Sequence, residues 1–252
     1  MRVSAVVVSH EQPDELEAST RLLLPQVDEL VAIANTPGSA GALDVGVELI
    51  ENEQPLGFAA NANAGIRATS GDAVLVANAD VAPHPGAVRT LAAFMESREA
   101  CGIAGPQLIF PDGSWQPSRR LFPTVRGTLV RRTPLRTIRP PLEHQRSHYG
   151  LDDRPAEPTR SDWMLGAFLL LRRSMLDEIG GFDERFRLYC EDIDLCYRAA
   201  RAGWERWYVP AAVVEHAYPA ATDAELFTRR TLWHWLGIVR FVHKHPERLR
   251  AL

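Results

Sequence analysis

Residues 3–34, with the sequence VSAVVVSHEQPDELEASTRLLLPQVDELVAIA, decide the fold class. The continuous apolar runs Val3–Ser9 and Leu30–Ala34 predict two buried strands. Between them, Pro13–Leu24 predicts a helix with a proline near its start, where the missing N–H removes no hydrogen bond. A strand, a helix and a second strand in this order are typical of a parallel βαβ unit.

The same alternation continues through the first hundred residues. Strands are predicted at Val47–Ile50 and Ala73–Ala77, and helices at Asn61–Thr69 and Pro85–Arg98. We therefore expect an α/β fold with a mostly parallel central sheet and helices on both faces. Ligands of such sheets bind beyond the carboxyl ends of the strands. Three polar groups are expected on that rim: Ser9-His10-Glu11, Asn35 and Asn78-Ala79-Asp80.

Composition bounds the class of protein. The chain has 252 residues, 46% hydrophobic and 24% charged, enough for one large α/β domain with a core. The net charge of −4 gives no general attraction to nucleic acid, so no nucleic-acid partner is expected. The amino terminus enters a strand without a basic lead, and the apolar run Met164–Leu171 is too short to cross a bilayer. Three cysteines fit no disulfide framework, which favours a cytoplasmic location.

The stretch Gly180–Arg198, GGFDERFRLYCEDIDLCYR, gives the clearest chemical signal. From Ile193 the apolar positions recur at helical spacing, so Glu191 and Asp192 should occupy the first turn of a helix. Their carboxylates then project beyond the helix end, where one of them could act as a general base. The alternative is that these acids only complement the helix dipole.

Four segments together resemble family 2 of the glycosyltransferases, the inverting enzymes of GT-A fold, and in particular its rhamnosyltransferase-like bacterial branch. The segments are residues 3–10, 55–66, 71–80 and 166–204. The resemblance implies a GT-A catalytic domain over residues 1–216, with a nucleotide-binding part at about 1–110 and an acceptor part at about 111–216. It leaves residues 217–252 as a C-terminal helical extension.

The resemblance places Asn78-Ala79-Asp80 at the family's Asp-x-Asp position, where Mg²⁺ or Mn²⁺ bridges the protein and a nucleotide diphosphate. A hard cation suits the charge that grows on a leaving diphosphate. Asp80 and His216 are the expected metal ligands, while Asn78 is expected to touch the nucleotide. An ordinary turn at residues 78–80 and a structural role for His216 are the alternatives.

The resemblance makes Asp192 the general base, because one carboxylate suffices to accept the proton of the acceptor hydroxyl in an inverting transfer. Glu191 would hydrogen-bond the acceptor or orient the loop. Asp194 has Arg198 four residues on, which predicts a surface ion pair.

The remaining site residues follow from the same motifs. Gly57 and Phe58 should offer free N–H groups to the anionic nucleotide at a helix start, and Asn61 and Asn63 could meet its hydroxyls, with helix capping as the alternative for Asn61. The expected nucleotide-binding set is Ser9, Glu11, Asn35, Gly57, Phe58, Asn61 and Asn78. The expected acceptor and sugar set is Glu191, Gly166, Ala167, Trp115 and Arg119.

Two departures from the family pattern are visible. The family usually has Asp-Asn after the second strand, whereas this chain has Ala34-Asn35, so base recognition would pass to Asn35 or Glu11. The Gln-x-x-Arg-Trp element of processive synthases is absent, which predicts the addition of a single sugar.

Two further segments have an open role. Seven arginines and no acid occur between Arg119 and Arg139, as expected for an acceptor-side loop that binds a pyrophosphate or an anionic membrane, or for a solvated basic loop. The predicted helix Ala224–Lys244 would pack on the domain or lie on a membrane surface.

The expected function is therefore a metal-dependent inverting glycosyltransferase of cell-wall, polysaccharide or glycoconjugate synthesis. It would move one sugar, with rhamnose as a candidate, from a dTDP- or UDP-sugar to a hydroxyl acceptor. A lipid-linked acceptor would bring it to the inner face of the membrane. The competing hypothesis is a catalytically silent relative that binds a nucleotide sugar. A nucleotidyltransferase or a dinucleotide oxidoreductase is disfavoured, because the chain lacks their glycine-rich loops.

Overall fold

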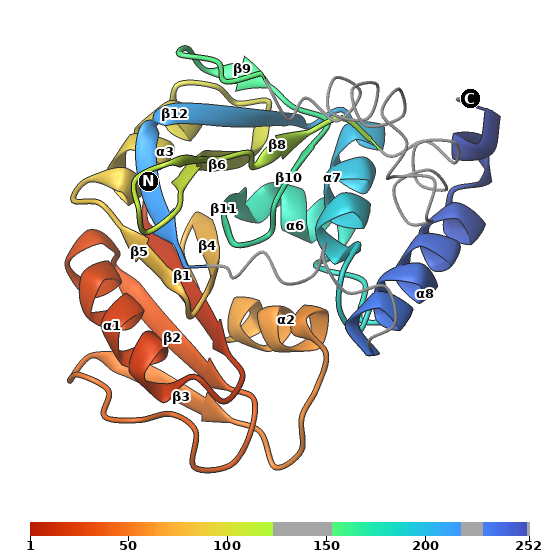
Figure 1. Cartoon of the computed structure of the whole chain (residues 1–252). Coiled ribbons are helices and arrows are strands. Elements are labelled where there is room, and N and C mark those ends of the chain that lie inside the picture. Colours follow the sequence, from red (N-terminus) through yellow and green to blue (C-terminus); the bar gives the residue numbers. More distant parts are fainter. Residues whose placement is uncertain (123–152, 218–228, 251–252) are drawn as a thin grey trace.

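The computed structural model describes residues 1–122, 153–217 and 229–250, with side chains of the last range described from 232 to 248. A ten-stranded sheet forms its centre (Figure 1). The strands lie in the order β3 (Val47–Glu51), β2 (Glu29–Ala34), β1 (Val3–Ser9), β4 (Ala73–Asn78), β11 (Phe168–Arg172), β6 (Cys101–Ile109), β12 (Glu205–His216) and β5 (Val81–Pro83). Off this path, β7 (Trp115–Gln116) pairs with β6 and β9 (Thr159–Arg160) pairs with β12.

The first four strands are parallel, as the sequence predicts. Val6 of β1 lies opposite Val31 of β2 on one side and Val76 of β4 on the other. All seven residues of β1 are buried, which explains why its sequence is apolar without alternation. The parallel half brings the carboxyl ends of β1, β2 and β4 to one rim.

Beyond β4 the sheet is mixed. β11 is antiparallel to both neighbours, β4 and β6, while β12 and β6 are again parallel. The apolar run Met164–Leu171 divides into β10 (Trp163–Met164), a turn, and β11; β10 pairs with β8 (Arg119–Arg120) in a second, two-stranded sheet. Because the turn Gly166–Ala167 precedes β11, this strand starts at the rim where β4 ends.

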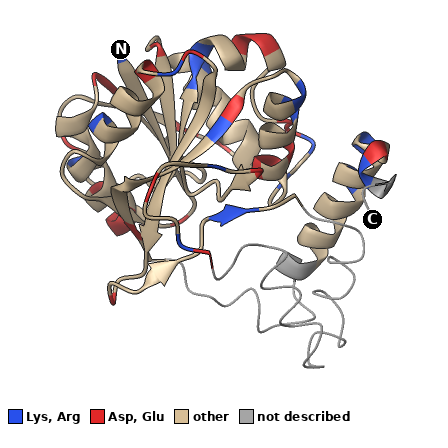
Figure 2. Ribbon diagram, turned by 90° about the horizontal axis from the view of Figure 1, so that it is seen from above, with Lys and Arg blue, Asp and Glu red and all other residues tan. Residues whose placement is uncertain are grey.

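Helices cover both faces of the sheet (Figures 1 and 2). They are α1 (Pro13–Leu23), α2 (Phe58–Ala68), α3 (Ala87–Glu96), α6 (Arg173–Ile179), α7 (Glu191–Arg201) and α8 (Arg229–Lys244), with 3₁₀ turns at Leu24–Gln26 and Pro246–Arg250. Leu16 and Leu91 pack α1 and α3 into one apolar cluster, whereas α2, α6 and α7 contribute to the other cluster. The α2 helix begins at Phe58, three residues before the predicted start.

The last helix, α8, lies beside α7 on the side of the molecule away from β1–β3 (Figure 1). Residues 224–228 of the predicted helix lie outside the described residues. Within the part of the chain that the structure describes, no helix is long and apolar enough to cross a membrane.

Asp194 corrects one expectation from the sequence. Its side chain is fully buried and contacts Arg198 at 2.7 Å, Lys244 at 2.9 Å and His245 at 2.8 Å. The predicted surface ion pair is therefore wrong: the pair with Arg198 exists, but it lies inside a cluster that α8 covers. The i,i+4 spacing predicts the pair of Asp194 with Arg198. It does not show that α8, about 50 residues later in the sequence, buries that pair.

Candidate active site

A two-residue turn joins the predicted base to the rim of the sheet. The Gly166 N–H donates to Asp192 Oδ2 over 3.1 Å, and the Asn78 N–H donates to the Ala167 carbonyl over 3.0 Å. A Cβ atom on Gly166 would lie 3.3 Å from Asp192 Cβ, so the small residue permits this close approach. The structure thus brings together Asp192, Gly166, Ala167 and Asn78, four residues that the sequence predicts for the site.

The two carboxyl groups at the start of α7 have different surroundings. Asp192 is half-buried and accepts hydrogen bonds from Gly166 and from the Ile193 N–H at 2.8 Å. Glu191 is 8% exposed, and its Oε2 has no hydrogen-bond partner among the described residues. A single charge on this pair is therefore better accommodated on Asp192.

Burial raises the pKa of both groups. The pKa of Glu191 is raised by burial first and then by the negative charge of Asp192. The pKa of Asp192 is raised by burial, while the N–H groups of Ile193 and Gly166 and the charge of Arg120 oppose that rise. Glu191 should thus be the neutral partner and Asp192 the ionised partner, since two adjacent carboxylates disfavour double ionisation.

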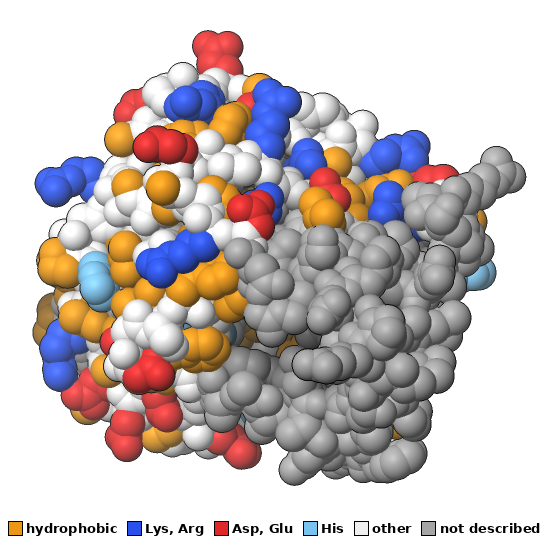
Figure 3. Space-filling model, turned by 45° about the horizontal axis from the view of Figure 1, so that its top comes forward, with side chains coloured by type: hydrophobic (Ala, Val, Ile, Leu, Met, Phe, Trp, Pro, Cys, Tyr) orange, Lys and Arg blue, Asp and Glu red, His pale blue; other side chains and the backbone are white. Residues whose placement is uncertain are grey.

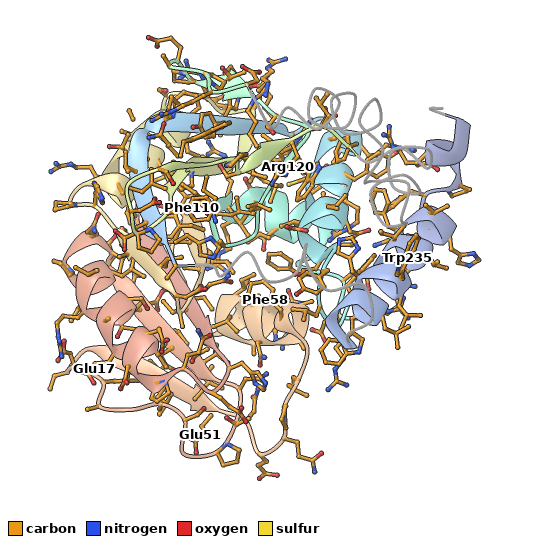
Figure 4. The ribbon with its side chains drawn as sticks, in the orientation of Figure 1. Glu17, Glu51, Phe58, Phe110, Arg120 and Trp235 are labelled. Atoms are coloured by element: carbon orange, nitrogen blue, oxygen red, sulfur yellow. The ribbon has the colours of Figure 1, made fainter. Side chains whose placement is uncertain are left out.

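Arg120 is a cation whose charge lowers the pKa of Asp192, and the sequence places it only in the basic loop of open role. It lies on β8 opposite Trp163 of β10, on the α7 side of the view in Figure 4. Arg119, which was predicted, instead forms an ion pair with Asp153 at 2.9 Å. The alternation of side chains along a strand explains why only one of two adjacent arginines influences Asp192. The other five arginines of the predicted basic loop lie outside the described residues.

Asp80 and His216 lie beside each other, as the sequence predicts for a metal pair. Asp80 Oδ1 is 3.5 Å from His216 Nε2, and His216 Nδ1 is 2.9 Å from Gln116 Oε1. An amide oxygen only accepts, so Nδ1 is the donor of this contact, and the Nε2 atom faces the carboxylate. A histidine held in this way by an outer partner is the usual arrangement of a metal ligand.

The donor set fits a divalent cation in part. One carboxylate oxygen and one imidazole nitrogen suit Mn²⁺ better than Mg²⁺, which prefers oxygen ligands. Among the described residues no group of three or more His, Cys, Asp or Glu side chains could hold a metal. Any remaining ligands would therefore come from the substrate, from water or from groups outside this set.

Asn35, the predicted base-recognition residue, is one of three asparagines whose side chains form a hydrogen-bonded chain. Asn52 Nδ2 donates to Asn35 Oδ1 at 2.9 Å and to Asn61 Oδ1 at 2.6 Å. Asn35 also pairs at both amide atoms with the backbone of Leu56. We call Asn35, Asn52 and Asn61 the asparagine cluster. Its side chains fix the loop, so the Asn35 amide is already occupied by protein groups.

His10 extends this cluster to the rim. Asn35 Nδ2 lies 3.3 Å from His10 Nδ1, and this amide nitrogen is the donor because Asn35 Oδ1 accepts the Leu56 N–H. His10 therefore presents an Nε2–H group. The neighbouring Glu11 is exposed and has a left-handed backbone, with φ 58°. Ser9 is buried and its hydroxyl donates to the Gln12 carbonyl, so it shapes this turn.

The predicted anion site at the start of α2 differs in the structure. The Phe58 N–H is not free, because it donates to the Arg187 carbonyl at 3.0 Å. A Cβ atom on Gly57 would lie 2.7 Å from the same carbonyl oxygen, so Gly57 permits the close approach of residues 182–190. Gly57 thus packs the two halves of the site together, and its contact with the nucleotide stays a prediction. Phe58 contacts Phe182 edge to face, and Figure 4 shows it on α2.

Asn63 also has a structural role instead of the predicted contact with the nucleotide. Its amide accepts from the Phe182 N–H and donates to the Phe182 carbonyl, both at 2.8 Å. A Cβ atom on Gly181 would lie 2.3 Å from Asn63 Oδ1. The Gly-Gly-Phe-Asp motif thus holds α2 in place, which its local sequence does not reveal.

Gln116, Asn52 and Lys244 are the other residues that sequence reasoning did not assign. Gln116 follows the predicted Trp115 on β7, where alternation points the neighbouring side chain to the opposite face. Trp115 itself is half-buried at the edge of β6, opposite Ile109. Lys244 is the only lysine of the chain. The composition makes this residue stand out, but it does not show which residues Lys244 contacts.

Comparison with known proteins gives one family. The model described as "Glycosyltransferase like family 2" matches residues 25–234. An N-acetylglucosaminyl-diphospho-decaprenol L-rhamnosyltransferase of Mycobacterium tuberculosis is 34% identical over 188 residues, 71% of this chain and 58% of the relative. A rhamnosyltransferase of Escherichia coli K12 is 38% identical over 81 residues, 32% of this chain and 30% of the relative. The chain thus spans little more than half of the first relative.

Two solved structures share the fold. GalNAc-T7 with UDP, GalNAc and Mn²⁺ matches with a TM-score of 0.67 and 17% identity, over 96% of this chain and 48% of that protein. The mannosyltransferase of Pyrobaculum calidifontis with GDP-mannose and Mn²⁺ matches with a TM-score of 0.58 and 15% identity, over 99% of this chain and 72% of that protein. The predicted GT-A fold is confirmed.

Proposed function

The chain belongs to the glycosyltransferase-like family 2, and on this premise we propose that it transfers one sugar from a nucleotide-diphospho-sugar to a hydroxyl acceptor with inversion. The observation that carries the proposal is the contact of Asp192 with the turn Gly166–Ala167, which in turn binds Asn78. This contact supports the proposal because it lies at the rim beyond the carboxyl ends of the strands, where ligands of α/β sheets bind.

In the proposed step the acceptor oxygen forms a bond to the anomeric carbon while the bond from that carbon to the diphosphate oxygen breaks. The bonding electron pair leaves with the diphosphate, and the acceptor proton passes to Asp192. Attack from the side opposite the leaving group inverts the anomeric centre. General-base catalysis of this kind typically contributes 10²–10⁴-fold to the rate.

Asp192 is favoured over Glu191 as the base because its charge is stabilised. Two backbone N–H groups bind the Asp192 carboxylate, whereas the more deeply buried Glu191 has a raised pKa and stays protonated beside it. A neutral Glu191 would donate a hydrogen bond to the acceptor or to Asp192. The raised pKa of Asp192 also makes it a stronger base once it is ionised.

Asp80 and His216 would hold a divalent cation in this proposal. When bound, the cation would neutralise charge on the diphosphate, and the Mn²⁺ in both similar solved structures supports this role. Gln116 would keep His216 in the tautomer that a cation requires. His10, Asn35 and Glu11 would line the base end of the nucleotide site.

The names of the relatives suggest the finer substrate class. Two of them are rhamnosyltransferases, and one name includes a diphospho-decaprenol, which is a lipid-linked group. We therefore propose rhamnose, from a dTDP- or UDP-linked donor, and a lipid-linked acceptor. The synthesis of a cell-wall or surface polysaccharide at the cytoplasmic face of the membrane would use this reaction.

The outer face of α8 supports a peripheral contact with a membrane. Leu232, Leu236 and Val239 are 57%, 53% and 62% exposed and recur at helical spacing on one stripe. Trp235, half-buried on the same helix in Figure 4, and the exposed Arg240 flank the stripe. Apolar, aromatic and basic residues in this order are typical of a helix at an anionic lipid surface. The part of the face in Figure 3 that is not grey shows charges of both signs among apolar side chains.

The donor site is tested by thermal shift with nucleotide diphosphates and diphospho-sugars, each with Mg²⁺, Mn²⁺ or EDTA. A ligand that binds only the native state raises Tm according to its affinity. We expect a metal-dependent shift with one nucleotide that Asp80→Ala removes. A shift that is equal with EDTA would reject the metal pair, and the absence of any shift would favour the catalytically silent alternative.

A further inference from the structure

The helix α8 contacts a strained part of the backbone. Tyr189 and Cys190, the two residues before α7, have φ values of 70° and 69°, in the left-handed region. Non-glycine residues in this region are strained and persist only where the surroundings enforce them. This left-handed turn sets the direction in which α7 begins, and Asp192 is the second residue of that helix.

Gly237 brings the backbone of α8 against this turn. A Cβ atom at position 237 would lie 2.9 Å from the Tyr189 carbonyl oxygen and 3.1 Å from Cys190 Sγ. A distance under 3.0 Å to a backbone atom requires a shift, so only glycine permits this contact. Tyr189 and His234 add a ring contact, with centroids 5.5 Å apart.

Lys244 fixes the C-terminal end of α8. Its ammonium group lies 2.7 Å from Asp183 Oδ2 and 2.9 Å from Asp194 Oδ1. Asp183 belongs to the loop before the left-handed turn, and the buried Asp194 belongs to the first turn of α7. Arg185 and Lys244 hold the pKa of Asp183 well below its usual range, so this carboxylate stays charged.

Arg198 and His245 complete the cluster around Asp194. The Arg198 guanidinium binds Asp194 and donates to the carbonyls of Ile179, Gly180 and Gly181. His245 is buried and lies 2.8 Å from Asp194 Oδ1. Of these three partners of Asp194, only Lys244 and His245 come from the C-terminal segment. Removing Lys244 would therefore weaken the attachment of α8 without emptying the cluster.

We propose that α8 positions the general base: Gly237 and Lys244 hold the left-handed turn Tyr189–Cys190, and thereby Asp192, in the geometry needed for transfer. Both are positioning residues, because neither touches a reacting atom. The assignment rests on the proposed role of Asp192.

The test compares Gly237→Ala and Lys244→Met with the wild type and with His243→Ala, a matched control on the exposed side of α8. We expect kcat to fall tenfold or more in both test variants, while the Kd of the nucleotide donor changes less than twofold. The acid limb of the kcat profile should move to lower pH, because a displaced turn exposes Asp192 to water. Lys244→Arg should recover most of the activity, and His243→Ala should behave as wild type.

Amide hydrogen exchange gives a readout that does not need turnover. Exchange at residues 189–193 should be faster in Gly237→Ala and Lys244→Met than in the wild type and His243→Ala. Alanine normally favours a helix interior over glycine, so a loss in Gly237→Ala reports the contact and not helix propensity. If Gly237→Ala does not fold, Lys244→Met is read in the same assays.

Two outcomes would overturn the proposal. Wild-type exchange at residues 189–193 in the test variants would show that α8 does not hold the turn. Faster exchange with unchanged kcat and pH profile would show that the turn does not position the base. An inert wild type with normal donor binding would instead reject the proposed function, and the exchange data would still decide whether α8 holds the turn.

Discussion

At the scale of single residues, two adjacent carboxyl groups have different surroundings, which supports the separate roles that we propose for them. Asp192 receives two backbone N–H groups, whereas Glu191 is nearly inaccessible and has one oxygen without a partner among the described atoms. A burial difference of this kind separates an ionised group from a neutral one more strongly than their intrinsic pKa values do.

Asp192→Asn should bind the donor as the wild type does and lose transfer by a factor on the order of hundreds or more. Glu191→Gln should retain transfer within about tenfold, since a neutral amide resembles the protonated acid that it replaces. Steady-state kinetics with the same donor and acceptor compare the two variants. The opposite pattern would assign the base role to Glu191.

The pH dependence of activity follows from the raised pKa of Asp192. The base must be ionised, so kcat should fall as the pH falls through a pKa above the ordinary carboxyl range. Glu191→Gln should keep this acid limb, because Glu191 is still neutral when Asp192 ionises. A profile without an acid limb above pH 5 would contradict the buried pair.

The stability of the protein should decrease with rising pH because of Glu191, whereas the activity should increase with rising pH because of Asp192. A carboxyl group whose folded-state pKa is raised contributes stability below its unfolded-state pKa, and this stability is lost as the pH rises through the folded-state pKa. The Tm of the wild type should therefore decrease from mildly acidic to alkaline pH by more than the Tm of Glu191→Gln. Each kcal/mol corresponds to about 2–4 °C in a chain of this size. Parallel Tm curves would show that Glu191 is not buried as described.

At the scale of elements, asparagines and glycines join segments that are distant in sequence. Asn35, which follows β2, and Asn61 on α2 both accept from Asn52, and Asn63 connects α2 to the loop before α7. These contacts explain why the parallel strands could be predicted from local patterns while the site loops could not. A buried strand needs only apolar residues, whereas a loop depends on partners that lie up to 121 residues away.

Asn52→Ala should reveal the asparagine cluster. It removes the donor to Asn35 Oδ1, which still accepts the Leu56 N–H, and the donor to the buried Asn61 Oδ1. Leaving a buried acceptor unsatisfied costs about 1–3 kcal/mol. We expect a lower Tm and weaker donor binding, because Asn35 and Asn61 are then no longer linked through Asn52. Asn52→Asp is the matched variant that keeps the shape and loses the donor. Unchanged Tm in both variants would contradict the cluster.

The sequence predicts those strands and helices accurately whose burial shows in their own local pattern of apolar residues. The predicted strand Val3–Ser9 matches β1, and the helix predicted at Pro13–Leu24 matches α1 within one residue. The antiparallel β11 and the burial of Asp194 were missed, since both depend on tertiary neighbours. In the site, the contact of Asp192 with Gly166 and the pair of Asp80 with His216 agree with the predicted groupings, and their chemical roles stay predictions.

At the scale of the whole molecule, α8 has two faces with separate contacts. Its inner face binds the loop and helix that carry the base candidate, and its outer face exposes three large aliphatic side chains. A helix with this division could bring the active site to a lipid-linked acceptor while it holds Asp192 in place. The chain spans 58% of the length of the similar rhamnosyltransferase of Mycobacterium tuberculosis.

Replacing Leu232 and Leu236 by aspartate should reduce flotation with anionic vesicles severalfold, because charge opposes insertion into the interface. Transfer to a short, water-soluble acceptor should not change, whereas transfer to a long-chain lipid acceptor should decrease. Vesicle flotation and the two transfer assays check this. Equal flotation of the variant and the wild type would remove the membrane role of α8.

The most direct test of the central claim is the anomeric configuration of the transferred sugar, measured by NMR on the product of the wild type and of Asp192→Asn. A product with the configuration opposite to that of the donor, formed by the wild type and reduced by a factor on the order of hundreds in Asp192→Asn, is the predicted result. A product that retains the donor configuration, or wild-type rates in Asp192→Asn, would contradict an inverting transfer with Asp192 as its base.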